Sequence, residues 1–181
     1  MHRPLVLTAS ILLSLTASQA FAQDGTVEKA EVFPRLRLGG SAGLGGGTMG
    51  IGVAASARAG IQIKSSWAVS YQFSVCGTEE FFKSSDIWKS HALLLEVTVP
   101  ETLITLGGGP SIVSGRREPS CGVECIAPAP SDYTDVGLDF RFARTFGARR
   151  PNVRGGFTLE LALHSAMRDT VVVLGIGADL F

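Results

Sequence analysis

Three residues near the C-terminal end carry the side chains that nucleophilic hydrolysis requires. Glu160, His164 and Ser165 could supply an orienting carboxylate, a general base and a nucleophile. In a β-strand, successive side chains point to opposite faces, so the adjacent His164 and Ser165 would face away from each other. Because a nucleophile and its base must lie within hydrogen-bond reach, we do not expect this group to be catalytic.

A larger set of ionisable residues is scattered among small side chains on the polar faces of predicted strands. Its members are Arg35, Arg37, Arg58, Glu96, Asp139, Arg141, Glu160 and His164. Buried charges must be partnered, so we expect these residues to form an ion-pair network that fills the interior of a barrel. A turn centred near Arg150 would place Arg141 opposite Glu160 on the inner face. A narrow solute channel is the alternative, and it would require these pairs to part.

Three cysteines offer a disulfide rather than a metal site. Cys121 and Cys125 are close enough in sequence to pair, and Cys76 could equally pair with either of them. A C-x3-C spacing without a neighbouring histidine is poor for structural zinc. The Gly107 to Gly109 run precedes no helix, so it is not a phosphate loop. We expect no metal and no cofactor.

The clearest structural signal is the stretch from Met49 to Cys76. Its odd positions, apart from the turn at Lys64 to Ser66, are apolar or aromatic, and its even positions are small or polar. A period of two indicates β-strands with one apolar and one polar face, whereas a helix would scatter this division. We therefore predict a long β-hairpin.

The same alternation recurs along the chain. It predicts eight strands, at about 35–44, 49–63, 67–76, 88–99, 103–114, 134–146, 154–164 and 170–181. Glycines and Pro110 suggest a bend or a bulge in the fifth strand. Short connections favour an all-β, antiparallel up-and-down meander, and an even number of strands can close into a barrel without an edge.

Length, composition and the N-terminal segment predict a single exported domain. The 181 residues are 45% hydrophobic and carry a formal net charge of zero, so there is no basic footprint for nucleic acid. Residues 1–22 read as a signal peptide, with Arg3, an apolar core and the site Ala20 to Ala22. Residues 23–32 form a short polar leader, and residues 33–181 form the barrel domain.

The polar face decides between a soluble and a membrane barrel. It is mostly Gly, Ala and Ser, which suits the cramped interior of eight strands, while the broad apolar face would aggregate in water. Connections at 64–66, 100–102 and 147–152 are short, and those at 77–86 and 115–132 are long, as in transmembrane β-barrels. We expect aromatic girdles formed by Trp67 and Phe146 at one interface and by Trp88 and Tyr133 at the other.

From Phe33 to Phe181 the chain resembles the small eight-stranded bacterial outer-membrane barrels typified by the OmpA membrane domain, OmpX and OmpW-like proteins. The resemblance implies a monomer in the outer membrane with outer-membrane lipid around it, and external loops whose ligand is unknown. It also implies recognition of the last strand by the barrel-assembly machinery through Phe181, although Phe181 is in phase with Gly175, Gly177 and Asp179 on the polar face rather than with the apolar face.

Two alternatives to a structural or interaction role follow. Lipid A deacylases of this architecture use His, Ser and Glu, but there the Ser follows the His by two positions, unlike Ser165. A secreted soluble barrel that holds an apolar ligand in its interior is the other alternative.

Overall fold

The computed structural model describes residues 34–48, 50–78, 87–117, 131–147, 149–150 and 153–181. The predicted signal peptide and leader lie outside these residues, as do Cys121 and Cys125 of the predicted disulfide. Cys76 is buried and forms no disulfide within the described part of the chain. No helix there is long and apolar enough to cross a bilayer.

Eight long antiparallel strands form the molecule, as predicted, and a two-residue strand is added to them. The strands are β1 (Arg35–Gly47), β2 (Gly50–Gln62), β3 (Trp67–Thr78), β4 (Ile87–Val99), β5 (Ile104–Arg117), β6 (Ser131–Phe146), β7 (Arg149–Arg150), β8 (Val153–Ala166) and β9 (Thr170–Leu180). The short β7 pairs with the start of β8 and extends its hairpin.

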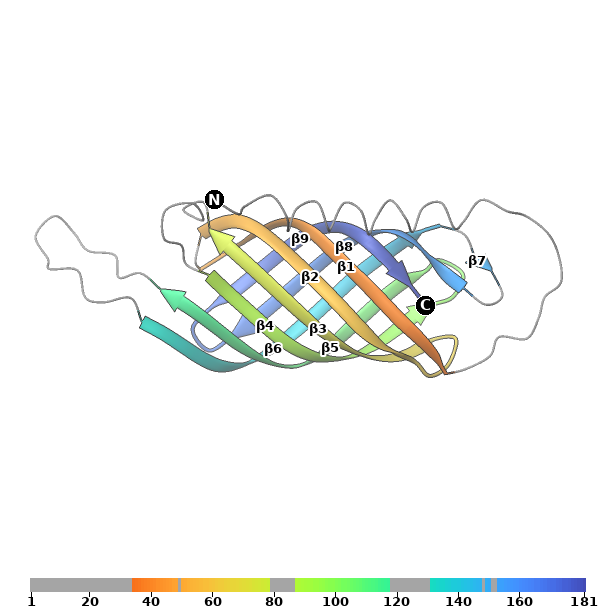
Figure 1. Ribbon diagram of the computed structural model, residues 1–181, viewed down its shortest axis with the longest axis horizontal. Helices are drawn as coiled ribbons and strands as arrows, with labels where there is room; N and C mark the ends of the chain where they lie inside the picture. Colours follow the sequence, from red (N-terminus) through yellow and green to blue (C-terminus); the bar gives the residue numbers. More distant parts are fainter. Residues whose placement is uncertain (1–33, 49, 79–86, 118–130, 148, 151–152) are drawn as a thin grey trace, which may run out of the picture.

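The sheet closes on itself. The long strands pair with their neighbours in sequence order, β6 pairs with β8, and β9 pairs back with β1. Figure 1 shows the tilted strands wrapped into a barrel. The predicted up-and-down topology is therefore confirmed, and closure pairs both edges of the sheet, which would otherwise expose unpaired backbone groups.

The alternation read from the sequence separates the two faces of the wall. In β4 the consecutive leucines Leu93, Leu94 and Leu95 are 56%, 0% and 52% exposed. The outward set is mostly apolar, and the fully buried inward set contains the charges of the lumen. The period of two is thus the pleat of each strand, with its apolar face turned outward.

Of the bend or bulge predicted in β5, the bulge is not present. The pairing of β4 with β5 keeps one register from Ile87↔Arg116 to Val99↔Ile104, and only the positions around Gly109 and Pro110 drop out of the ladder. A bulge would insert a residue and shift the register. Proline lacks an N–H group, so it interrupts the ladder without shifting it.

The barrel has two different ends. The β2–β3 and β4–β5 turns lie at one end together with the C-terminus, and we call this the short-turn end. The connections over 79–86 and 118–130 join strands at the other end, which we call the loop end, on the left in Figure 1.

Candidate functional site

Six charged residues meet in the lumen, and each comes from a different strand. They are Arg37 (β1), Arg58 (β2), Glu96 (β4), Arg141 (β6), Glu160 (β8) and Asp179 (β9), and we call them the charge cluster. None is more than 4% exposed. Three guanidinium groups face three carboxylates, so the cluster has no formal net charge.

Arg141 lies at the centre of this cluster. Its Nε donates to Glu160 Oε2 at 2.7 Å, its Nη1 to Glu96 Oε1 at 3.1 Å and its Nη2 to Asp179 Oδ2 at 2.8 Å. The planar fork of the guanidinium can satisfy three acceptors in different directions, which an ammonium group on a flexible stem would do less well. Arg141 therefore ties β6 to β4, β8 and β9.

The other two arginines extend the cluster toward the short-turn end. Arg58 pairs with Asp179 and lies 3.5 Å from Glu160. Arg37 Nε lies 3.4 Å from Glu96. Its Nη atoms donate to three neutral acceptors at 3.2 Å, namely Gln62, Thr98 and Thr105. Neutral partners complete the hydrogen bonding that the carboxylates leave open.

Glycines on the inner face provide the space for these long side chains. A Cβ atom at Gly39 would overlap the Asp179 carboxylate and the Arg58 guanidinium. A Cβ at Gly107 would lie 3.0 Å from Glu96 Cγ. Gly39 and Gly107 are therefore positions where a charged neighbour occupies the space that a side chain would need.

A second polar group lies nearer the loop end. His164 Nδ1 and Asp139 Oδ2 are 2.7 Å apart, and Ser90 Oγ donates to the same oxygen at 2.8 Å. The hydroxyl thus contacts the carboxylate, not the imidazole. Among the described residues no hydroxyl hydrogen-bonds to His164, so this group lacks the nucleophile-to-base contact of a hydrolase.

An apolar layer packs around this group. The buried members of the layer are Ala54, Cys76, Trp88, Val113, Ala162, Val171 and Val173. The Trp88 ring lies 4.8 Å from the His164 ring, centroid to centroid. Above this layer, Tyr133 donates its hydroxyl hydrogen to Asp169. Side chains from the described strands thus occupy the lumen in successive layers.

The structure differs from the prediction at the Arg141–Glu160 pair and at Arg35. Arg141 is directly opposite Ala162, and Glu160 is opposite Ala143, so the register differs by two residues from the predicted one. The reason is that the centre of the turn lies one residue further along the chain than predicted, because β7 continues the same register to Arg150↔Val153. Arg141 still reaches Glu160, but diagonally. Arg35 is half-buried at the start of β1 and opposite Gln62.

The aromatic residues divide differently from the prediction. Trp67 and Phe146 face outward, and both are 44% exposed. Trp88 is 1% exposed and Tyr133 packs against the interior layer, so their predicted place in an outer girdle is wrong. Both positions have the inward phase of their strands, which decides where the side chain points.

Sequence reasoning left Asp179 out of the charge cluster. Its neighbour Phe181 is 4% exposed, and Arg37 Cζ lies 4.4 Å from the centre of the Phe181 ring. The pairing of β9 with both neighbours is continuous, so no bulge turns Phe181 outward. The phase of Asp179 in the last strand was the signal that could have placed it in the lumen.

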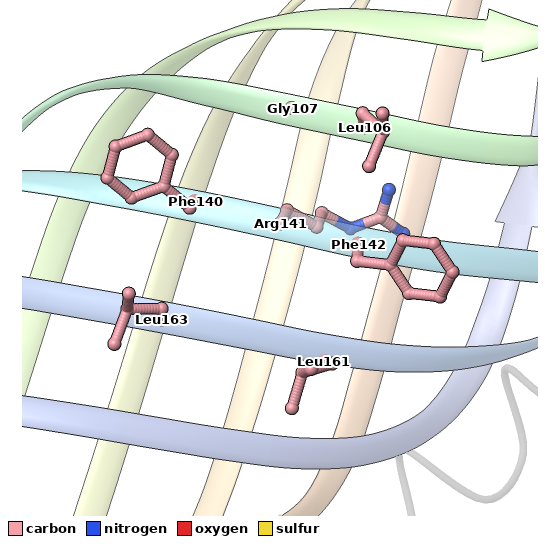
Figure 2. A pocket seen from close by; sticks show the side chains of 7 residues that line it. All are labelled: Leu106, Gly107, Phe140, Arg141, Phe142, Leu161 and Leu163. Atoms are coloured by element: carbon pink, nitrogen blue, oxygen red, sulfur yellow. The ribbon is translucent and has the colours of Figure 1, made fainter.

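The other sequence-based sites carry no catalytic geometry. Ser165 follows His164 on the outer face of β8. Among the described residues, no group of three or more His, Cys, Asp or Glu side chains could hold a metal ion. A hollow of about 310 Å³ lies on the outer wall of β5, β6 and β8 (Figure 2). Its side chains are apolar ones that point outward, Leu106, Phe140, Phe142, Leu161 and Leu163, and its floor is formed at Gly107 and Arg141.

Comparison with known proteins identifies the fold. No family model and no curated protein sequence matches the chain. Among solved structures, it is similar to Ail, the attachment invasion locus protein of Yersinia pestis, crystallised with the heparin analogue sucrose octasulfate. The TM-score is 0.52, with 13% identity, and the match covers 82% of this chain and 99% of Ail. Neisserial surface protein A matches with a TM-score of 0.48 and 13% identity, over 80% of this chain and 94% of that protein. The chain has the fold of a small eight-stranded barrel, as expected from the resemblance.

Removal of one member of the charge cluster should leave buried, unpaired charge. We predict that Arg141→Met lowers the free energy of unfolding by about 3–5 kcal/mol and that Glu160→Gln lowers it as well. The double variant should lose at least about 1 kcal/mol less than the sum of the two single losses. Denaturant unfolding of the barrel refolded in detergent micelles measures this. Arg144→Gln, on the outer face of β6, should be additive with Glu160→Gln. Additive losses for Arg141 and Glu160 would contradict the pairing.

The two tryptophans offer a matched test of the interior layer. Trp88→Ala should leave a cavity and cost about 3–5 kcal/mol of unfolding free energy. Trp67→Ala removes an outward side chain of the same size and should cost much less. The same unfolding measurement compares them, and equal losses would show that Trp88 does not fill the lumen.

Proposed function

We propose that this chain is an integral outer-membrane β-barrel with a structural or interaction role, that its lumen is filled by side chains, and that it is not an enzyme. One observation carries the proposal. The exposed side chains on the wall are apolar and the buried ones include the charges, which is the reverse of a soluble protein. Leu174 and Ile51 are 65% and 66% exposed, while Glu96 and Arg141 are 0% and 2% exposed.

This reversal argues against the secreted soluble barrel. A soluble barrel that holds an apolar ligand would have an apolar lumen and a polar outer wall. Here every long strand exposes large apolar or aromatic side chains on the outer wall. An apolar surface of that extent in water would be an aggregation site, but in a bilayer it is the required contact surface.

The height of the apolar wall supports the same proposal. On β6 the outward residues between Thr134 and Arg144 are apolar, at Val136, Leu138, Phe140 and Phe142. At about 3.3 Å per residue and a strand tilt of about 40°, the two polar borders Thr134 and Arg144 are about 25 Å apart along the barrel axis. This distance matches the height of the apolar band of transmembrane β-barrels. Arg144, whose guanidinium lies 4.9 Å from the Phe146 ring centre, marks its short-turn border.

The filled lumen argues against the narrow-channel alternative. A solute would have to pass the apolar layer around Trp88 and then separate the ion pairs of Arg141. Breaking a buried pair is costly because the separated charges lose their partners. The packing of the lumen therefore favours a structural role over solute transport.

The role of the barrel is then expected at its surfaces. The two longest connections, between β3 and β4 and between β5 and β6, are at the loop end, and in transmembrane barrels the longer loops face outward from the cell. Phe181 remains our proposed contact for the barrel-assembly machinery, although its ring packs over Arg37 in the folded barrel. Recognition through Phe181 would therefore have to precede barrel closure.

Single-tryptophan variants test the orientation of the wall. The chain has two tryptophans, so Trp88→Phe leaves Trp67 and Trp67→Phe leaves Trp88. In vesicles of brominated phosphatidylcholine, the fluorescence of Trp67 should be strongly quenched and that of Trp88 should remain. Equal protection of both tryptophans, or recovery of the protein as a soluble monomer without detergent, would contradict a membrane barrel.

Conductance measurements test the filled lumen. The refolded protein, added to a planar bilayer, should produce no stable conductance steps, because the charge cluster and the layer around Trp88 block ion passage. Heat-modifiable mobility on gels verifies that the added protein is folded. Reproducible single-channel steps would restore the channel alternative.

A further inference from the structure

Three hydrogen-bond donors lie together on the outer face of β4 and β5, close to the loop end. Lys89 and His91 project outward from β4 and Arg116 projects outward from β5, and all three side chains are exposed. Lys89 pairs with Ser114 and Ile87 pairs with Arg116, so Lys89 and Arg116 are diagonal neighbours on that face. We call Lys89, His91 and Arg116 the cationic strip.

The neighbouring strand sets the hydrogen-bonding state of His91. Tyr71 Oη lies 2.6 Å from His91 Nδ1, and the Phe73 ring lies 5.0 Å from the His91 ring. When the phenol donates to Nδ1, the neutral imidazole carries its proton on Nε2. We assign this tautomer from the contact, and it leaves the Nε2–H group of His91 as a donor for a group outside the protein.

The wall below the strip is apolar. Toward the short-turn end, Leu93, Leu95 and Ile112 are 56%, 52% and 57% exposed. At the loop-end edge of β1 and β2, the outward residues Leu44, Ile51 and Val53 are apolar. The strip thus makes one sector of the wall amphipathic, with donors at the loop-end edge and an apolar surface beneath them.

The cationic strip also carries positive charge on Lys89 and Arg116. Within the described residues, neither Lys89 nor Arg116 forms an ion pair with a protein carboxylate. Asp132 of β6 is the carboxylate opposite Arg116 in the strand register. Lys89 has Val75 and Ser114 as its cross-strand neighbours. Counted over the described residues of this face alone, two cations and the His91 donor lie beside one acid.

We propose that the cationic strip binds the phosphate headgroup of a lipid, whose acyl chains lie against the apolar wall of β3, β4 and β5. This proposal rests on the membrane location proposed above. Charge-assisted hydrogen bonds from a lysine, an arginine and a histidine suit a phosphate, which presents several acceptor oxygens. Each cation near an anionic membrane surface adds to the attraction, so the pair favours an anionic over a zwitterionic lipid.

Native mass spectrometry of the detergent-solubilised full barrel tests the proposal. The probes are dioleoyl phosphatidic acid and dioleoyl phosphatidylcholine, which share their acyl chains and differ in the headgroup. The parent should retain phosphatidic acid in about tenfold preference over phosphatidylcholine. The double variant Lys89→Gln/Arg116→Gln should lose the preference, and His91→Phe, which keeps an aromatic ring, should reduce it.

Arg168→Gln is the matched control. Arg168 is a loop-end cation that is 66% exposed, but it lies in the β8–β9 turn and pairs with Asp135, away from the strip. The control should keep the full preference for phosphatidic acid. If both variants lose the preference equally, general loop-end charge explains it and the strip is not a site. If the double variant keeps it, the proposal is also wrong.

Two further outcomes separate the alternatives. Displacement of phosphatidic acid by millimolar inorganic phosphate would indicate a free-anion site and overturn the lipid assignment. Heat-modifiable mobility is measured on the same preparations, and Trp67 quenching is measured on the Trp88→Phe variant in vesicles of brominated phosphatidylcholine. Absence of any lipid preference in the parent, together with a quenched Trp67 in that variant, overturns the strip alone, whereas an unquenched Trp67 overturns the membrane location itself.

Discussion

The charge cluster in the lumen is the constraint on which the rest of the barrel depends. Six of the eight long strands contribute one charged residue each, and the remaining two take part through hydroxyl groups, Ser70 of β3 on Glu96 and Thr105 of β5 on Arg37. A slip of one residue in any strand would turn its charge toward the outer face and leave a partner unpaired. In a fold with few packed aliphatic side chains in its interior, these ion pairs specify the register.

The composition of the inner face follows from this cluster. An eight-stranded barrel has an interior just wide enough for side chains, so long arginines need small neighbours. Gly39 and Gly107 provide that space beside Asp179 and Glu96. At these two positions glycine is a packing requirement of the lumen. Loss of one partner would leave a buried unpaired charge, so the cluster favours one register of the strands more than it adds to stability.

The fold could be predicted from the sequence because a period of two has one structural meaning, and the turn residues limit each strand. The contacts within the charge cluster were harder to predict from the sequence. Arg141 and Glu160 could be recognised as inward residues, but their register depends on where the turn is centred, which the pattern does not reveal. Trp88 and Tyr133 were placed wrongly for a different reason. They were assigned to a girdle because aromatic residues are common at membrane interfaces, although both positions have the inward phase of their strands. Asp179 was missed since the last strand was read for its terminal aromatic residue.

Because side chains fill the lumen, the function of the barrel has to be sought on its outer surface. Between the charge cluster and the loop end, the Asp139–His164 pair and the layer around Trp88 leave these polar groups without contact to solvent. Chemistry that needs substrate access therefore cannot use them in the folded state. Polar side chains on the outer wall are different, because every donor placed beside lipid has a desolvation cost that only a partner offsets. On β4 and β5 that cost falls on Lys89, His91 and Arg116, and an anionic headgroup is the partner that a membrane surface supplies.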